Sequence, residues 1–342
     1  SEEIIVNLKE VNRLIDKVTL DVDKSANYKL RLWLDLKDIT DEAKEALVGQ
    51  KIFLALKING IQNVNPTKVN GIGAKVLITL TNNIGGSGLY TITHEADSTL
   101  QIGTNENTVE YRYRGKDPKN YVTFNNEVWR IIGIFPTDDG TGKIENKIKI
   151  VRNESIGNKY WDTSNSNNWA RPATLNTELN TTYLNSLDST SKSMIVNTKY
   201  YLGGYNNSLQ IPKDVMYQYE RKIIGSTYYN GSNPNSWVGK LGLMYASDYG
   251  YAASDECTQT LYNYNNATCK NNNWLFKGNT ECILPQLASL SNVVFLVYSV
   301  GSVGYYRVSD DQIGVRPVLY LISSAKIIDG TGTSTDPYTL GL

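Results

Sequence analysis

The sequence contains one histidine, His94, and no signature motif of a common enzyme class. A G-x-S-x-G elbow, a Walker loop, an H-E-x-x-H pair and a G-x-G-x-x-G turn after a strand are all absent. Most nucleophile–base designs use a histidine, so a single one argues against that chemistry. We expect no enzymatic activity. A carboxylate pair drawn from Asp248, Asp255 and Glu256 leaves glycoside hydrolysis as an alternative.

The chain also lacks an excess of charge, since 34 Lys and Arg residues balance 34 Asp and Glu residues. Without a cationic stretch, neither nucleic acid nor a membrane-surface helix is an expected partner. No apolar run is long enough to span a bilayer. The chain opens with Ser1-Glu2-Glu3 rather than a signal peptide. We expect that a signal or anchor was removed, and that contact with a membrane occurs only through such an anchor.

Metal and cofactor sites are not expected either. Zinc needs about four ligands, and His94 is distant in sequence from the cysteines. Asp310-Asp311 could contribute to calcium binding, but no EF-type loop is present and surface acids are the simpler interpretation. No cofactor is predicted.

Aromatic residues are strongly biased, with 24 Tyr against 5 Phe. Tyrosine combines an apolar ring with a polar end that tolerates water. Asn, Ser, Thr and Gly are abundant in the second half of the chain. This composition is typical of a loop-rich surface protein, so we expect an extracellular location.

The three cysteines lie close together near the C-terminus. Cys257 and Cys269 would close a loop of about a dozen residues, which is a plausible disulfide. The alternative is two buried free thiols. Cys282 is the odd residue, either buried or a reactive thiol.

Two domains are predicted, and the first covers residues 1–82. Alternating apolar residues at 18–22, 28–36 and 52–56 indicate half-buried strands, and residues 41–47 can form one or two helical turns. Strands of this kind joined by short polar connections predict a small all-β sandwich that serves as a stalk. A Gly- and Asn-rich stretch at 82–88 is interpreted as the joint between the domains.

The second predicted domain, residues 83–342, mixes strands and helices, so the fold class is α+β. Strands are predicted at 109–115, 121–124, 128–134, 147–151, 293–297, 303–308 and 314–321. The Asn125-Asn126 pair indicates a hairpin turn. Helical spacing predicts helices at 173–186 and 189–196. Residues 204–282 are interpreted as mostly loop.

Residues 293–314 divide into two alternating sets. The expected inward set is apolar or small: Phe295, Val297, Ser299, Gly301, Val303 and Val308. The expected outward set follows no regular hydropathy: Leu296, Tyr298, Val300, Ser302, Gly304, Tyr305, Tyr306, Arg307, Ser309 and Asp311. An outward strand face is usually polar, so exposed Leu, Tyr and Arg indicate a binding surface. A strand buried on both faces is the alternative.

Several motifs resemble those of a large group of surface proteins from gut Firmicutes. They are Tyr113-Arg114-Gly115, Tyr121-Val122-Thr123-Phe124, Trp129-Arg130-Ile131-Ile132, Leu243-Met244-Tyr245-Ala246-Ser247-Asp248-Tyr249-Gly250-Tyr251-Ala252, Asn273-Trp274-Leu275, Gly314-Val315-Arg316-Pro317-Val318-Leu319-Tyr320-Leu321, Gly330-Thr331-Gly332 and Asp336-Pro337-Tyr338. These proteins are similar to the C-type-lectin-fold variable proteins of diversity-generating retroelements, whose fold resembles that of formylglycine-generating enzymes. The resemblance covers residues 86–342.

The resemblance implies a C-type-lectin-like domain with a variable, ligand-binding face at about 284–313. Leu287, Leu290 and Asn292 would extend the outward set listed above. It also implies structural roles for Trp129, Trp274 and a paired Arg316. Cys257 and Cys269 occupy a loop position typical of the surface group, so the enzymatic activity is not implied. Cys282-Ile283-Leu284-Pro285 departs from the Thr-Leu-Ser-Pro-like run of relatives.

The expected function is adhesion or ligand binding, with a protein or glycan on another surface as partner. A pilus or shaft subunit is the alternative from a structural class. An enzyme of the formylglycine-generating or carbohydrate-active type is the alternative from a catalytic class.

Overall fold

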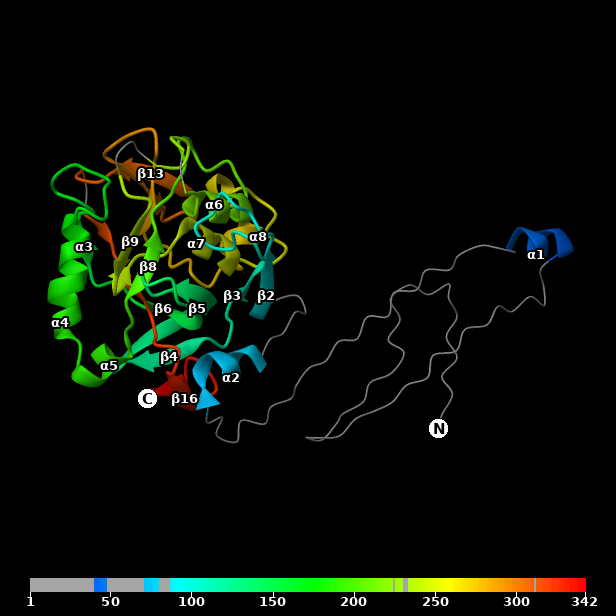
Figure 1. Ribbon diagram of the computed structural model, residues 1–342, viewed down its shortest axis with the longest axis horizontal. Coiled ribbons are helices and arrows are strands. Elements are labelled where there is room, and N and C mark those ends of the chain that lie inside the picture. Colours follow the sequence, from blue (N-terminus) through cyan, green and yellow to red (C-terminus); the bar gives the residue numbers. More distant parts are fainter. Residues whose placement is uncertain (1–39, 48–70, 80–86, 224, 230–232, 311) are drawn as a thin grey trace. The chain divides into compact units, whose positions relative to one another are not determined.

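The computed structural model describes residues 40–47, 71–79, 87–223, 225–229, 233–310 and 312–342 (Figure 1). The chain divides into two units, residues 1–59 and residues 60–342. In the first unit the described element is helix α1 (Asp41–Leu47), which confirms the predicted helical turns. Asp41 and Glu42 lie in its first turn, where negative charge complements the helix dipole. The strands predicted at 18–22, 28–36 and 52–56 lie outside the described residues.

The second unit begins earlier than the predicted boundary at residue 83. Strand β1 (Gly71–Ile72) pairs with strand β16 (Lys326–Asp329), and helix α2 (Gly73–Thr79) follows it directly. Ala74, Val76 and Leu77 of α2 are buried in the core of the second unit. The Gly- and Asn-rich stretch at 82–88 therefore does not mark the joint, because core residues precede it.

The larger sheet of the second unit has ten strands among the described residues. Its main path runs β1-β16-β17-β4-β5-β6-β15-β10, and β2 joins β3, which pairs with β5. The remaining bounds are β2 (Gly88–His94), β3 (Thr108–Arg114), β4 (Tyr121–Phe124), β5 (Glu127–Asp138), β6 (Ile144–Arg152), β10 (Leu241–Gly242), β15 (Val318–Tyr320) and β17 (Tyr338–Gly341).

The predicted hairpin between β4 and β5 is confirmed. Asn125 and Asn126 both adopt positive φ, 53° and 57°, between the paired residues Phe124 and Glu127. Asparagine tolerates this backbone region better than most residues, and two such residues match the twist of a tight hairpin.

The two predicted helices are also confirmed. The first is a continuous run of α3 (Thr174–Glu178), the π-helical η1 (Leu179–Tyr183) and α4 (Leu184–Ser186). The second is α5 (Ser189–Met194), whose N-cap Asp188 accepts a hydrogen bond from the Ser191 amide at 2.8 Å.

The stretch predicted as mostly loop carries more helix than expected. It contains α6 (Lys213–Glu220), α7 (Ala246–Ala252), the 3₁₀ turn η2 (Leu261–Asn263) and α8 (Ala267–Lys270), together with β9 (Ser236–Gly239), which pairs with β8 (Thr198–Tyr201). Every residue of α7 is buried. Because a helix buried all round lacks a polar face, it shows no helical periodicity in sequence.

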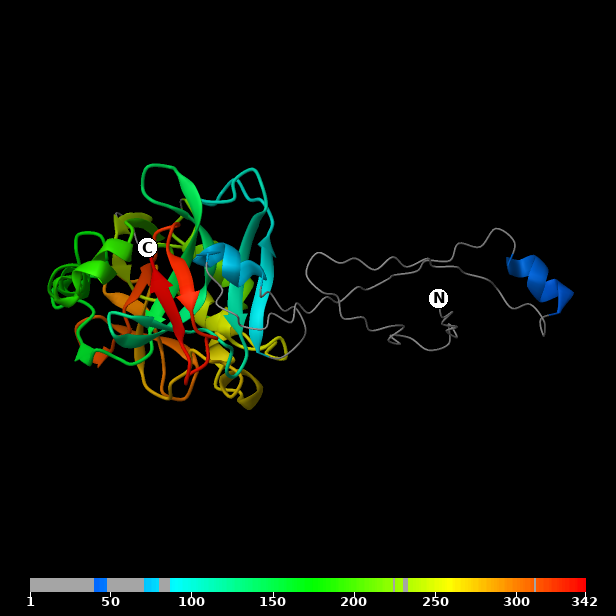
Figure 2. The same ribbon diagram turned by 90° about the horizontal axis from the view of Figure 1, so that it is seen from below.

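The second sheet has five described strands in the order β13-β12-β11-β14-β7. They are β7 (Asn158–Lys159), β11 (Glu281–Gln286), β12 (Val293–Val297), β13 (Val303–Arg307) and β14 (Ile313–Gly314). The predicted strand at 314–321 is thus divided: Gly314 belongs to this sheet and Val318–Tyr320 to the larger one. Figure 2 shows the same unit turned by a quarter, with strands of both sheets and peripheral helices. The second unit is a mixed α+β structure.

Candidate binding face

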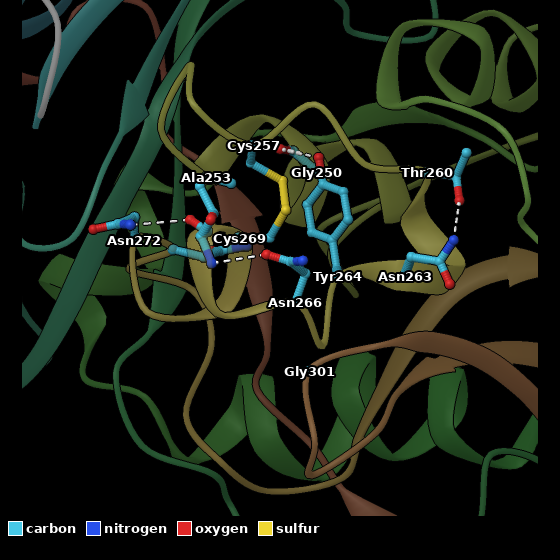
Figure 3. Close-up of a disulfide and its surroundings, with 12 residues drawn as sticks. Gly250, Ala253, Cys257, Thr260, Asn263, Tyr264, Asn266, Cys269, Asn272 and Gly301 are labelled. Atoms are coloured by element: carbon cyan, nitrogen blue, oxygen red, sulfur yellow. Dashed lines mark hydrogen bonds between the residues drawn. A yellow bond between two sulfur atoms is a disulfide. The ribbon is translucent and has the colours of Figure 1, made fainter.

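Cys257 and Cys269 form the disulfide that the sequence suggested, with a separation of 12 residues (Figure 3). Both cysteines are buried. The loop that they close contains η2 and Tyr264, whose hydroxyl donates to the Gly250 carbonyl at 3.0 Å. The disulfide therefore closes the loop of residues 257–269, and the Tyr264 hydrogen bond holds this loop against helix α7.

The turn between β12 and β13 rests on this disulfide loop. Within the turn, the Gly301 amide donates to the Tyr298 carbonyl at 2.8 Å, and Gly301 has a φ of +101°. The Tyr249 hydroxyl, from α7, donates to the Gly301 carbonyl at 2.8 Å. A Cβ at Gly301 would lie 3.3 Å from the Tyr264 carbonyl oxygen. Glycine is required here both for the positive φ and for the close approach.

Three tyrosines stand out on this part of the surface. Tyr298 is 38% exposed, Tyr305 47% and Tyr262 46%, and no other tyrosine of the described residues is classed as exposed. The Tyr298 hydroxyl donates to the Tyr305 carbonyl at 3.2 Å. Partial burial raises the pKa of Tyr298, and the nearby Tyr305 and Tyr262 raise it further. The three residues therefore lie near one another at the hairpin and the disulfide loop, although Tyr305 and the Tyr298 ring point to opposite sides of β13.

Tyr262 was missed by the sequence-based prediction. It lies in η2, 36 positions before Tyr298, inside a stretch interpreted as loop. The only signal that bears on it is the suggested disulfide, which marks the segment as a constrained loop without saying what it packs against.

Other predicted face residues are accessible as well. Val300 is 53% exposed and Leu290 is 48% exposed. Arg307 is exposed, whereas Ser302 is partly exposed. We call the set Tyr262, Leu290, Tyr298, Val300, Tyr305 and Arg307 the tyrosine face.

Three residues placed on the outward face are instead buried. Leu296 is 1% exposed, Leu287 is 4% exposed, and Gly304 is also buried. All five residues of β12, which pairs with β11 on one edge and β13 on the other, are buried, so both faces of the strand are covered. The alternative of a strand buried on both faces is therefore correct for β12, and the expected outward position of Leu296 is wrong.

Gly304 has a specific reason to lack a side chain. It pairs with Leu296 in the hairpin, and a Cβ at this position would lie 2.0 Å from the ring of Tyr298. The Tyr298 ring thus covers Gly304. A substitution there would displace the tyrosine from its place on the face.

Ser299 was expected to point inward, yet it is exposed. The alternation of a strand ends at Val297, because the turn begins at Tyr298. Period-two reasoning therefore fails within the turn.

Tyr305, Tyr306 and Arg307 cannot share one face, because consecutive residues of a strand point to opposite sides. Tyr305 and Arg307 are exposed, whereas Tyr306 is only partly so. The Tyr306 hydroxyl lies 3.2 Å from the Cys282 Sγ. Tyr306 therefore contributes to packing at the edge of the sheet as well as to the surface.

Two of the remaining predicted positions meet at Asn165. Ser309 donates to Asn165 Oδ1 at 3.1 Å, and Asn292 donates to the same oxygen at 3.1 Å. Both are partly exposed. Asp311 lies outside the described residues.

Cys282 is a free thiol that is 2% exposed. Burial raises its pKa to about 12, although the hydrogen bond with Tyr306 lowers it somewhat. The thiolate is the reactive form of cysteine, so this residue is a packing group rather than a nucleophile.

The three residues assigned structural roles are buried. Trp129 is fully buried, and Trp274 donates from its indole to the Tyr113 carbonyl at 2.7 Å. Arg316 forms an ion pair with Glu281 at 2.6 Å and donates to the Leu275 carbonyl at 2.7 Å. Arg316 is therefore a paired structural arginine, as expected.

The acids considered for catalysis lie in different surroundings. Asp248 is buried between Arg112, at 2.9 Å, and Lys149, at 2.5 Å. Asp255 is exposed and pairs with Arg114, while Glu256 lies on the surface. A glycosidase uses two carboxyl groups that face one cleft, whereas Asp248 is buried and paired with two cations.

Asp248 belongs to a larger buried cluster that the sequence did not indicate. Arg112 also pairs with Glu110 at 2.8 Å, and Glu110 lies 3.2 Å from the His94 ring. His94 stacks on Tyr217 with ring centroids 3.5 Å apart. We call Glu110, Arg112, Lys149 and Asp248 the ionic cluster. Burial lowers the pKa of His94, so the ring beside the cluster is neutral at neutral pH.

Comparison with protein-family models, with curated proteins and with solved structures found no match to this chain. In the described ranges, no group of three or more His, Cys, Asp or Glu side chains is placed to hold a metal ion. No helix within those ranges has both the length and the apolar character needed to cross a bilayer.

Proposed function

We propose that this chain is an extracellular bacterial surface protein that binds a protein or glycan ligand through the tyrosine face. We further propose that its second unit is a C-type-lectin-like domain and that retroelement-directed mutation diversifies this face. The observation that carries the proposal is the gathering of all the exposed described tyrosines at the β12–β13 hairpin and the disulfide loop.

The chemistry of the face supports binding. Tyrosine provides a large rigid contact area with few rotatable bonds, and arginine adds directional hydrogen bonds. Val300 adds apolar surface in the same turn as Tyr298, and Leu290 adds it beyond the other end of the hairpin, near Arg307. Other exposed apolar residues of the described ranges are scattered, but the exposed tyrosines gather here, and such a gathering is more typical of an interaction surface.

The support beneath the face is rigid. The hairpin turn is fixed by the Tyr249–Gly301 hydrogen bond, and β12 is buried on both sides. A face held this way does not have to be ordered on binding, which lowers the entropic cost of association. It also allows exposed residues to change without disturbing the core.

Sequencing of this locus across many isolates tests the diversification. Substitutions are expected at Leu290, Tyr298, Val300, Tyr305 and Arg307. They are expected to spare the buried positions Leu287, Leu296 and Gly304, although these lie between the variable ones. Variation spread evenly over both groups, or absent from both, would contradict the proposal.

A binding experiment tests the face directly. Fluorescently labelled protein is applied to a glycan microarray and to cultured gut bacterial cells. For any probe that is bound, the double variant Tyr298→Ala/Tyr305→Ala is expected to weaken binding by at least ~10-fold, since central aromatic anchors carry most interface energy. Val128→Ala is the matched control, because Val128 is 42% exposed on β5 in the other sheet. Equal losses of binding for the two variants would show that the tyrosine face is not the binding site.

A further inference from the structure

A lysine, an asparagine and a glutamate meet in a line at the junction of the two sheets. Lys277 Nζ donates to the side-chain carbonyl oxygen of Asn153 at 2.8 Å. The side-chain nitrogen of Asn153 donates in turn to Glu154 Oε1 at 2.7 Å. None of these residues belongs to the tyrosine face or to the ionic cluster.

We propose that Lys277 and Asn153 form an intramolecular amide bond, with Glu154 as the group that transfers the proton. The arrangement presents an amine nitrogen at an amide carbonyl and a carboxylate at the nitrogen that must leave. These are the three groups that an exchange of one amide nitrogen for another requires.

The reaction balances without any other reagent. The lone pair of the neutral Lys277 amine attacks the Asn153 side-chain carbonyl carbon, and a carbon–nitrogen bond forms. Glu154 accepts a proton from the attacking nitrogen and delivers it to the Asn153 amide nitrogen. The original carbon–nitrogen bond then breaks and one molecule of ammonia leaves. No electrons are exchanged and no water is consumed.

The geometry favours this step. The carbonyl carbon lies only about 1.2 Å from the oxygen that accepts the lysine hydrogen bond, so the amine is next to the group it attacks and needs only to turn its lone pair toward that carbon. Hydrogen bonds fix the chain at Asn153 and close to Lys277. The Asn153 amide donates to the Val128 carbonyl at 3.0 Å, and the Leu275 amide, two residues before Lys277, donates to Asn273 Oδ1 at 3.0 Å.

The electrostatic surroundings make the amine available. Burial and, to a smaller extent, the positive charges of Arg316 and Arg130 together lower the pKa of Lys277 to about 8, against the opposing effect of Glu154 and Glu281. About one lysine in ten would then be neutral at pH 7. The same arginines favour the negative charge that develops on the carbonyl oxygen during attack.

Another lysine of the structure shows why the pair is specific. Lys149 lies 2.5 Å from Asp248, but Arg112 and Lys149 lower the pKa of Asp248 and keep it ionised, although burial opposes them. A carboxylate resists attack by an amine far more than a neutral amide does. Lys149 is therefore not expected to form an amide bond despite its short distance to Asp248, whereas Lys277 lies beside a neutral amide.

The bond would connect distant parts of the chain. Asn153 directly follows β6 of the larger sheet, and Lys277 precedes β11 of the smaller sheet, with 124 positions between them. A covalent link over so long a loop restricts the unfolded chain more than the 12-residue disulfide does. Cross-linking of the two sheets would suit a protein exposed outside the cell.

Mass spectrometry of the reduced, unfolded full chain tests the proposal. The expected intact mass is lower than the sequence mass by one ammonia, and digestion should yield one branched peptide that contains both Asn153 and Lys277. Lys277→Arg keeps the positive charge but cannot form the bond, so its mass should equal the sequence mass. Lys222→Arg is the matched control and should retain the deficit. At the same time after synthesis, a smaller fraction of Glu154→Gln chains than of wild-type chains should show the mass deficit.

Cyclisation of Asn-Gly pairs, such as Asn59-Gly60, also releases ammonia, so the site must be identified. A succinimide hydrolyses in mild alkali, whereas an amide cross-link survives. A full sequence mass for the wild-type chain, recovery of linear peptides only, or a deficit that persists in Lys277→Arg would each overturn the proposal.

Discussion

The ionic cluster and the tyrosine face use polar side chains in opposite ways. In the cluster, Arg112, Lys149 and Asp248 are buried and held by one another. On the face, Tyr262, Tyr298 and Tyr305 are exposed above a buried strand. Removal of a cluster side chain leaves its partner charged and buried without a counter-charge. Removal of a side chain on the face exposes only a little more of the surface to water. Fold stability therefore depends on the cluster, and the face is free to vary.

The largest effect is expected from Asp248→Asn. The substitution preserves the shape of the side chain but removes the charge shared by Arg112 and Lys149. Removal of one partner from a buried ion pair costs about 3–5 kcal/mol. Equilibrium unfolding in urea should therefore show a reduction of that size in the free energy of unfolding.

The matched control is Asp310→Asn, since Asp310 is exposed beyond the end of β13. It should change the free energy of unfolding by less than about 0.5 kcal/mol. Similar values for the two variants would mean that the cluster does not stabilise the fold.

The loop closed by the disulfide contacts both regions. It packs against α7, the helix that carries Asp248, and it supports the turn of the β12–β13 hairpin. Replacement of Cys257 and Cys269 by serine should lower the free energy of unfolding by about 2–4 kcal/mol. Hydrogen exchange at the Gly301 amide should also become faster, since Tyr264 packs against this turn. Unchanged exchange at Gly301 would show that the turn is held without the loop.

How much of the face could be predicted is best seen in β12 and β13. Apolar content and alternation correctly located both strands. They did not reveal that β12 lies between two other strands and is covered on both faces, so Leu296 was wrongly placed outside. Which strands flank another strand depends on contacts distant in sequence, such as Cys282 opposite Leu296. Local periodicity contains no information on these contacts.

The ionic cluster was not predicted at all. Arg112 alternates with apolar residues in β3 and reads as a solvent-facing position. Its burial depends on Asp248, which lies 136 positions later in a helix without periodicity. Isolated charges in sequence show no sign of their partners. Buried pairs of this kind become visible only once the fold is known.

A smaller, pH-dependent effect is expected next to the cluster. Burial lowers the pKa of His94 below its ordinary value, against the opposing effect of Glu110. As pH falls below about 6.5, the unfolded chain binds a proton that the folded chain resists, so stability decreases. In His94→Gln this contribution disappears. The difference in unfolding free energy between wild type and variant should therefore change between pH 7 and pH 5, as measured by urea unfolding. A constant difference would contradict the lowered pKa.

The smallest effect on stability is expected from the tyrosine face itself. Tyr305 is 47% exposed, and its ring supports no buried charge, so Tyr305→Ala should change the free energy of unfolding by about 0.5 kcal/mol or less. Tyr262→Ala should behave in the same way, although it lies in a different segment. The stabilities of both variants are measured by thermal unfolding and compared with that of Leu296→Ala. Leu296 is 1% exposed, and its truncation should cost about 2–5 kcal/mol. If Tyr305→Ala were as destabilising as Leu296→Ala, the tyrosine would be part of the core, and the separation between a stable scaffold and a variable face would fail.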